Sequence, residues 1–252
     1  MFNEVADRLS SAAVGKVDKL KGSLSRYLVL SMMAGAYVGV AVLLLVTIGG
    51  AVGASPYKGV MFGVAFGVAL SLVMMTGAEL FTGANMIMVV GALDRKVTWL
   101  DTINVWVVCY IGNFIGSFLL GWMFVQSGLA HGATGDFILG LAAKKMHGEF
   151  FELFFRGILC NILVCVAVYI CYRIKDDTAK LIMIFWCLFA FITSGFEHCV
   201  ANMTTFSMAL IMPGSTLTVA GMVHNLIPVT LGNIVGGGFF MGAGYWFVGN
   251  KK

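Results

Sequence analysis

The sequence predicts an all-α integral membrane protein in which six transmembrane helices form two inverted three-helix repeats, with the second and fifth helices interrupted. Three observations support this fold class: a composition poor in charge, six long stretches without a charged residue, and a motif that occurs once in each half of the chain. Hydrophobic residues make up 60% of the sequence and charged residues 11%. Soluble domains carry about 25% charged residues, so this composition indicates a membrane protein.

The stretches between the charges are long enough to cross a bilayer. A crossing needs about 20 apolar residues, and formal charges are missing from 27–57, 59–78, 102–135, 157–172, 181–196 and 198–250. We therefore expect spans near 27–52, 59–93, 98–127, 150–172, 181–212 and 225–248. Six crossings place both termini on the same side of the membrane.

The internal repeat relates the two halves of the chain. Residues 77–86 read GAELFTGANM, and residues 195–203 read GFEHCVANM, one residue shorter. A Gly-Asn pair follows each copy, at 112–113 and at 232–233. Three spans per half require the second half to enter the membrane in the opposite direction, an arrangement typical of channels and transporters with broken helices.

These boundaries divide the chain into two regions. Residues 1–25 form a cytoplasmic amphipathic segment, and residues 26–252 form the six-span domain. Within that domain, the first repeat covers 26–127 and the inverted second repeat covers 150–252. A further short helix is expected outside the membrane, within 132–149, because an acidic start at Asp136 and a basic end at Lys145 suit the helix dipole.

The distribution of basic residues predicts the orientation. With six spans, one face collects Arg8, Lys16, Lys19, Lys21, Arg26, Arg95, Lys96, Arg173, Lys175, Lys180, Lys251 and Lys252, whereas the other has Lys58, Lys144 and Lys145. Loops rich in Lys and Arg stay in the cytoplasm. We therefore expect a multi-pass protein of the cell (inner) membrane with both termini cytoplasmic. The dispersed charges give no support for a nucleic-acid partner.

The segment before the first span is amphipathic. Apolar residues recur at helical spacing among charged ones, which predicts a helix on the cytoplasmic membrane surface; they are Phe2, Val5, Leu9, Ala13, Val17 and Leu20. Such a helix either anchors the protein or gates it. We favour the anchor, because terminal surface helices commonly have no further role.

Each copy of the repeated motif carries an acid at membrane depth, Glu79 or Glu197. Intramembrane carboxylates are costly and usually functional. A helix break exposes backbone groups, which is tolerated where protein or a water-lined cavity satisfies them. We interpret both acids as loop scaffolds, with direct proton transfer as the alternative. Asn85 and Asn202 are interpreted as braces of the same loops, and Arg156 is the cation within a span that could pair with an acid.

His198 distinguishes the two copies of the motif, since the first copy has Leu80, Phe81 and Thr82 in the corresponding stretch. An imidazole can donate a hydrogen bond or change charge near neutral pH. A packing role is the ordinary interpretation of a histidine in apolar surroundings, but its position at a helix break favours a functional one. Glu197 and Cys199 beside it do not have the spacing of a metal site. We expect no bound metal and no cofactor, and we interpret the six cysteines as small buried hydrophobic residues.

Five ordered segments carry a family resemblance: ELFT at 79–82, CNILVCVAV at 160–168, SGFEH at 194–198, ANM at 201–203 and GN at 232–233. In these segments the chain resembles the formate/nitrite transporter family, whose members are pentamers with a pore through each six-span protomer. The resemblance implies apolar pore constrictions at Phe66, Leu70, Leu80, Phe81, Val164 and Phe191. It implies polar substrate contacts at Thr82, Asn161, His198 and Lys145, the last in an outer vestibule.

The predicted function is a channel or transporter for a small monovalent weak-acid anion, with no enzymatic activity. The stretch AGAYVG at 34–39 looks most similar to the family's nitrite and hydrosulfide branches, so we favour hydrosulfide or nitrite over formate. The expected partners are the anion, the lipid bilayer and further copies of the chain in a homopentamer.

Three alternatives remain open. An aquaporin-like neutral-solute channel also uses two asparagine-bearing breaks in inverted repeats, although the Ala-Asn-Met triplets differ from its Asn-Pro-Ala signature. An intramembrane oxidoreductase using His198 or Cys199 would need paired heme-ligand histidines or a clustered metal motif, which the sequence does not show. A purely structural membrane protein would leave two costly acids unexplained.

Overall fold

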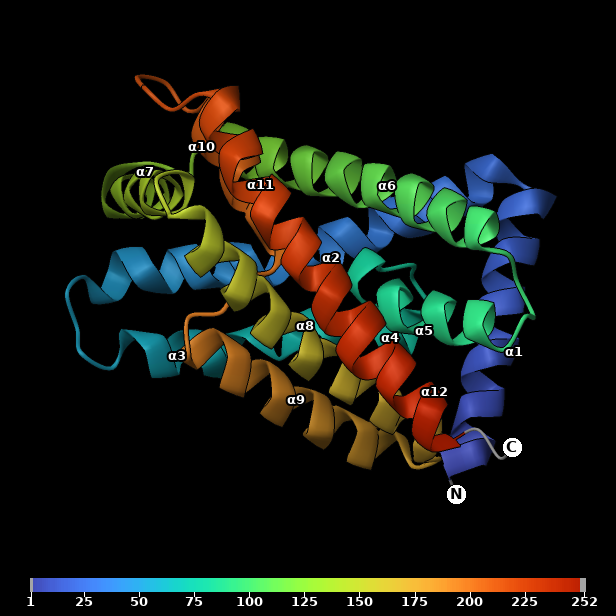
Figure 1. Cartoon of the computed structure of the whole chain (residues 1–252). Coiled ribbons are helices and arrows are strands. Elements are labelled where there is room, and N and C mark those ends of the chain that lie inside the picture. The colour runs from blue at the N-terminus through green and yellow to red at the C-terminus, as the bar shows by residue number, and fades with distance from the viewer. Residues whose placement is uncertain (1, 250–252) are drawn as a thin grey trace.

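The computed structural model describes residues 2–249, and every regular element in this range is a helix (Figure 1). The predicted all-α class is therefore confirmed. Met1 and residues 250–252 lie outside the described part. The predicted region boundaries at 1 and 252, and the predicted cytoplasmic Lys251 and Lys252, therefore lie outside it too. The helices are α1 (Phe2–Gly22), α2 (Leu24–Val52), α3 (Lys58–Phe66), α4 (Val68–Thr76), α5 (Phe81–Leu93), α6 (Trp99–Gln126), α7 (Gly132–Met146), α8 (Phe150–Arg173), α9 (Asp177–Thr193), α10 (Cys199–Ile211), α11 (Val219–Ile234), the π-helix η1 (Val235–Ala243) and α12 (Gly244–Gly249).

Several of these elements can span a membrane. Five described segments are long and apolar enough to do so: Leu24–Val52, Lys58–Thr76, Trp99–Gln126, Phe150–Arg173 and Val219–Gly249. The apolar helices α5 and α10 are shorter, with 13 residues each. The chain is therefore a multi-pass membrane protein.

The repeated motif coincides with two breaks in the helices. The chain leaves α4 at Gly77 with a φ of 72° and leaves α9 at Gly195 with a φ of 74°. Left-handed backbone favours glycine, because a side chain would be strained there. Each break is followed by a largely buried 13-residue helix that begins at Phe81 or Cys199.

Glycines bring the long helices into backbone contact behind each break. A Cβ added at Gly116 of α6 would lie 1.9 Å from the Met32 carbonyl of α2. A Cβ at Gly232 of α11 would lie 2.2 Å from the Phe154 carbonyl of α8. These distances leave no space for a side chain, so the small residues allow α6 and α11 to pack directly on their neighbours.

The helices α1 and α7 lie at opposite ends of the bundle (Figure 1). In α1, the apolar face buries Val5, Leu9, Ala13 and Val17, and the helix packs against α5 and α12. The helix α7 packs mainly against α2 and α10, and it falls within 132–149, where a short helix was predicted.

Candidate functional site

Asn113 of α6 holds the first break together. Its Oδ1 accepts the Phe81 N–H at 2.9 Å, and its Nδ2 donates to the carbonyls of Glu79 at 2.9 Å and Ser31 at 2.7 Å. The Glu79 N–H donates to the Leu30 carbonyl at 3.2 Å. Protein groups thus satisfy the backbone that the break exposes, as a break at membrane depth requires.

Asn233 of α11 does the same at the second break. Its Oδ1 accepts the Cys199 N–H at 3.0 Å, and its Nδ2 donates to the carbonyls of Glu197 at 3.0 Å and Gly157 at 2.8 Å. The Glu197 N–H donates to the Arg156 carbonyl at 3.2 Å. Each of the four hydrogen bonds at the first break has a counterpart here.

These roles of Asn113 and Asn233 were not predicted from the sequence. The signal was present, because a Gly-Asn pair follows each copy of the motif at nearly the same distance. In both cases the glycine allows close packing of the helix, and the asparagine one residue later reaches the break.

The Glu79 side chain is almost fully buried and pairs with α1. It contacts the Lys16 ammonium group, and Lys19 Nζ lies 3.0 Å from Glu79 Oε1. Burial lowers the pKa of Lys16, but the facing Glu79 carboxylate outweighs burial and holds this pKa above its usual value. Lys16 therefore stays charged, although it lies on the buried side of α1.

Glu197 is neutralised from the other end of the bundle. Lys145 Nζ of α7 lies 2.7 and 2.8 Å from its two carboxylate oxygens. Asn202 donates to Glu197 at 2.6 Å and to Asn225 Oδ1 at 2.8 Å, and Asn225 donates to the Lys145 carbonyl at 2.8 Å. These side chains form a closed ring of hydrogen bonds around one ion pair.

Arg156 and Asn85 have partners other than those expected from the sequence. The suggestion that Arg156 pairs with an intramembrane acid is wrong: its guanidinium contacts Glu152 of the same helix at 3.1 Å, one turn away. Asn85 lies within α5, where its Oδ1 accepts a hydrogen bond from Asn161 at 3.0 Å. Asn85 is the fifth residue of its helix and Asn202 the fourth of its own, so the two side chains point in different directions.

A vestibule of about 840 Å³ opens beside α7. We call it the α7 vestibule, and its walls include Lys58, Lys144, Lys145, Arg156, Asp136, Glu152 and Glu197. Four basic and three acidic side chains thus line it. Its inner end reaches Phe66, Phe191 and His198.

A second vestibule, of about 260 Å³, lies beside α1 and is called the α1 vestibule. Lys16, Lys19 and Glu79 line it, and its inner end is formed by Leu70 and Leu80. It therefore approaches the centre of the bundle from the end opposite to the α7 vestibule.

A small chamber of about 10 Å³ lies between the two vestibules. Its lining comprises Val38, Phe66, Ala69, Leu70, Leu80, Val164, Leu188, Phe191 and His198. Phe66 and Phe191 also line the α7 vestibule, and their ring centroids are 5.7 Å apart. Leu70 and Leu80 also line the α1 vestibule. The three cavities therefore follow one another, with an aromatic and an aliphatic constriction between them.

His198 is the polar side chain of the chamber. Its Nδ1 accepts the Ala201 N–H at 3.2 Å, so the side chain caps α10. An acceptor at Nδ1 places the ring proton of the neutral imidazole on Nε2. Nε2 lies 3.0 Å from Thr82 Oγ1 and donates to it.

The structure brings six of the predicted pore residues together around the chamber: Phe66, Leu70, Leu80, Val164, Phe191 and His198. The other members of the predicted set lie around it. Lys145 lines the α7 vestibule, and Thr82 reaches the chamber through His198.

Phe81 and Asn161 do not line the three cavities. Phe81 packs against Trp106 and Tyr110 of α6, with ring centroids at 6.5 and 5.0 Å. Asn161 Nδ2 donates to the carbonyls of Thr82 and Asn233. It thereby connects α8 to the start of α5 and to the end of α11.

Comparison with known proteins gives one consistent result. The family model described as formate/nitrite transporter matches residues 3–247. The nitrite transporter NirC of Escherichia coli (strain K12) is 39% identical over 257 residues, covering 100% of this chain and 94% of NirC. A solved FNT family ion channel superposes with a TM-score of 0.92 at 35% identity, covering 97% of this chain and 98% of that one. A pentameric formate channel with formate bound gives 0.79 at 31% identity, covering 90% and 98%.

Proposed function

We propose, since this chain belongs to the formate/nitrite transporter family, that it conducts a small monovalent weak-acid anion through the passage within its own helix bundle. The observation that carries the proposal is the sequence of cavities: two charged vestibules separated by an apolar chamber with one imidazole. The prediction of a transport protein rather than an enzyme is confirmed, because the family model and the matched relatives are transporters and channels.

We further propose that six spans form two inverted repeats, 26–127 and 150–252, in an aquaporin-like protomer. The matching hydrogen bonds of Asn113 and Asn233 at the two breaks support this symmetry. The opposite positions of α1 and α7, which neutralise Glu79 and Glu197 from the two ends of the bundle, support the inversion. The excess of basic residues on one face supports cytoplasmic termini in the cell (inner) membrane, with 1–25 as the cytoplasmic segment.

A homopentamer is the assembly we propose. Its support is the likeness to a pentameric formate channel at a TM-score of 0.79. In such an assembly each protomer retains its own passage, because the three cavities are lined by residues of a single chain.

Anion entry is proposed to start in the α7 vestibule. Lys58, Lys144, Lys145 and Arg156 outnumber the acids there and raise the local concentration of anions. The Phe66 and Phe191 rings then exclude a hydrated ion, because the chamber beyond them holds on the order of one water molecule. The ion passes only if side chains of the constrictions move and most of its hydration shell is lost.

His198 would offer the replacement for that hydration. The Nε2–H that donates to Thr82 can turn to an anion in the chamber, while Nδ1 remains bound to the Ala201 N–H. A proton that the anion takes up from water of the α7 vestibule would let a neutral acid cross Leu70 and Leu80, with the neutral His198 ring acting as hydrogen-bond donor and not as the proton source. A neutral species crosses an apolar constriction at far lower desolvation cost than an ion.

We propose hydrosulfide or nitrite as the permeant, with formate as a further candidate. The 39% identity to a nitrite transporter supports nitrite, and the 31% identity to a formate channel keeps formate in the test. Hydrosulfide rests on the resemblance of residues 34–39 to that branch. All three are small monovalent weak-acid anions that one pore chemistry accommodates.

The test is a flux comparison in proteoliposomes of hydrosulfide, nitrite, formate and chloride at several pH values. We expect the weak-acid anions to cross faster than chloride, with a rate that rises at lower pH. Protein-free liposomes and liposomes with Phe66→Trp, which should narrow the aromatic constriction, serve as controls. Water or glycerol permeation without anion flux would replace this proposal with the neutral-solute channel.

A further inference from the structure

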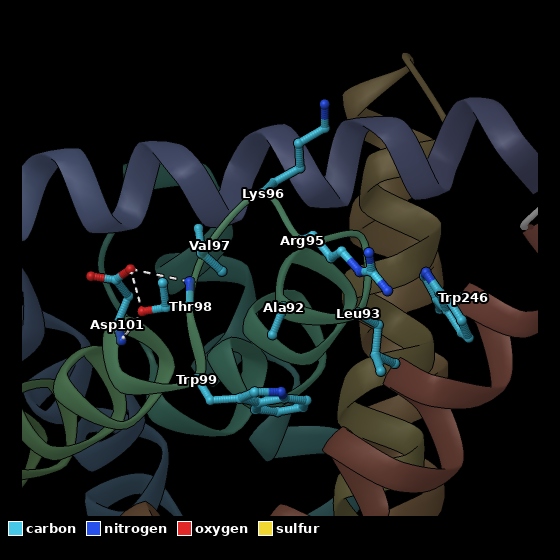
Figure 2. Close-up of a pocket in the computed structure, with 9 residues that line it drawn as sticks. All are labelled: Ala92, Leu93, Arg95, Lys96, Val97, Thr98, Trp99, Asp101 and Trp246. Carbon is cyan, nitrogen blue, oxygen red and sulfur yellow. Dashed lines mark hydrogen bonds between the residues drawn. The ribbon is translucent and has the colours of Figure 1, made fainter.

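A surface groove of about 830 Å³ lies outside the passage, where the turn between α5 and α6 faces α12. Figure 2 shows its lining, which runs along the turn from Ala92 to Trp99 and includes Asp101 of α6 and Trp246 of α12. The groove is on the α1 side of the bundle, and neither the chamber nor the vestibules include its residues.

The groove carries two cations without an ion pair. Arg95 and Lys96 are exposed, and neither forms a salt bridge within residues 2–249. Of the acids beside them, Asp101 pairs with Lys21 at 2.9 Å, whereas Asp94 accepts hydrogen bonds from the neutral donors Trp246, at 2.6 Å, and Ser10, and so keeps one negative charge against the two positive charges of Arg95 and Lys96. The charge that remains available to a ligand is therefore positive.

The backbone at Arg95 is unusual. Its φ of 57° is the single positive value at a non-glycine residue in the described chain. Helices commonly end in this conformation with glycine, because a side chain there is strained. Strained residues of this kind concentrate at binding sites.

The groove is also bordered by apolar surface. Trp99, which lines the groove, is 53% exposed. Trp246 also lines the groove and is partly buried, with its indole N–H bound to Asp94. Tryptophan at the ends of membrane-spanning helices lies at the headgroup level of the bilayer. Cationic and apolar surfaces thus meet where a bilayer has its headgroups.

We propose that this groove binds an anionic phospholipid. Arg95 and Lys96 contact the phosphate, and Trp99 and Trp246 contact the glycerol and the upper part of the acyl chains. Basic pockets beside membrane helices bind anionic headgroups in this way, and a guanidinium fork matches a phosphate well. A soluble phosphate would use the cations but not the tryptophans, so the apolar border favours a lipid. The proposal does not depend on which ion the passage conducts.

Native mass spectrometry of the purified, assembled protein tests it, with phosphatidylglycerol and phosphatidylcholine of the same chain length as probes. We expect the protein to bind phosphatidylglycerol about tenfold more tightly or better, since each basic residue at an anionic lipid surface contributes substantially. Arg95→Gln combined with Lys96→Gln should reduce this preference to about twofold or less. Size-exclusion profiles and thermal transitions check that the variants assemble.

A matched control removes the same charges elsewhere on that face. Arg26 and Lys175 are exposed and form no salt bridge in the described chain, so Arg26→Gln with Lys175→Gln should keep the preference. Trp99→Ala should weaken long-chain more than short-chain phosphatidylglycerol.

Four results would overturn the lipid site. The preference for phosphatidylglycerol could persist without Arg95 and Lys96, which would show that these two residues do not bind the lipid. Both double variants could lose the preference equally, which would indicate an effect of general surface charge. Glycerol phosphate could displace the lipid at equal concentration, which would indicate a soluble-phosphate site. Arg95 could be protected from an arginine-reactive reagent in the lipid-free assembly, which would indicate that a second copy of the chain covers the groove.

Discussion

The two helix breaks share their backbone chemistry and differ in their charge chemistry. At each break, one asparagine of the following long helix satisfies an N–H group and two carbonyls. The acid of the first break is paired with Lys16 and Lys19 of α1, and the acid of the second with Lys145 of α7. Burial in the membrane requires the backbone groups at both breaks to be hydrogen-bonded. The helix that provides the cation, in contrast, differs between the two halves.

The residue before each short helix shows a second difference. Leu80 precedes α5 and provides no side-chain cap, while His198 precedes α10 and caps it through Nδ1. Both side chains face the chamber. The repeat therefore supplies two equivalent positions, and a polar, titratable group occupies only one of them. The two breaks therefore share the same backbone hydrogen bonds, but only one of them presents a polar side chain to the chamber.

The largest effect is expected from the asparagines that the breaks share. Asn113→Ala orphans the Phe81 N–H and removes a donor from two carbonyls, and Asn233→Ala does the same around Cys199. A buried unsatisfied group costs about 1–3 kcal/mol, so we expect each variant to lose about 3 kcal/mol of unfolding free energy. Chemical unfolding in detergent measures the loss.

Ser117→Ala is the matched control for these variants, because it removes a single 3.3 Å hydrogen bond on α6. It should cost about 1 kcal/mol or less. A large loss at one asparagine and none at the other would show that the two breaks are not equivalent in backbone chemistry.

His198 sharpens the comparison at the chamber. We expect His198→Phe to reduce anion flux at least about tenfold, because the anion loses a buried hydrogen-bond donor, a loss of about 1–3 kcal/mol. His198→Asn should retain the helix cap, because asparagine caps helices well, but it removes the Nε2–H that reaches Thr82, so flux should fall although α10 stays capped. Flux measured in liposomes across several pH values separates the two roles. If His198→Phe leaves both rate and pH response intact, His198 has no part in the mechanism.

Variants of Lys16 and Lys145 test whether each ion pair stabilises only the helix that carries its lysine. Lys16→Met leaves the buried Glu79 carboxylate with Lys19, which is itself 54% exposed. We expect this variant to lose about 2 kcal/mol of unfolding free energy, less than when a fully buried charge is left without any partner. We also expect faster amide hydrogen exchange in α1. Lys145→Met should act on α7 and spare α1. Equal exchange in α1 for both variants would contradict a local role.

The Lys16–Glu79 pair predicts how the stability of α1 depends on pH. Because the pKa of Lys16 lies above its usual value of 10.5 in the folded protein, its contribution to stability is fully present below 10.5 and is lost as the pH rises through the folded pKa. We therefore expect α1 to remain protected, after correction for intrinsic exchange rates, from neutral pH up to at least about pH 10.

The sequence predicted the parts of this molecule that depend on local chemistry. Stretches free of charge located the apolar helices, and the repeated motif located both breaks. The pairing of Lys16 with Glu79 was missed, because it joins residues 63 positions apart and the amphipathic pattern alone indicates a surface helix. Lys16 follows Ala13 by three residues and precedes Leu20 by four, so it lies on the apolar face, which is the signal that was available.

The directions of Asn85 and Asn202 on their short helices were also not predicted from the sequence. The Ala-Asn-Met triplets match in letters, but the first motif has one more residue after the start of its helix, which turns Asn85 toward Asn161 and leaves Asn202 beside Glu197. The π-helix η1 was also not predicted. Its glycines fit against Asn161 and Asn85, where a Cβ at Gly237 would lie 2.3 Å from Asn161 Nδ2, and that contact depends on the tertiary packing.

The smallest effect is expected at Arg156, and it tests which cation serves the second break. Its guanidinium pairs with exposed Glu152 one turn away, and only its backbone carbonyl reaches Glu197. Exposed pairs at this spacing contribute about 0.3–0.5 kcal/mol, so Arg156→Gln should change the unfolding free energy by no more than that. Lys145→Met, which breaks a mostly buried pair, should cost several times more. If the two variants were equally destabilising, Arg156 would share the neutralisation of Glu197, and the second break would resemble the first in drawing on two cations.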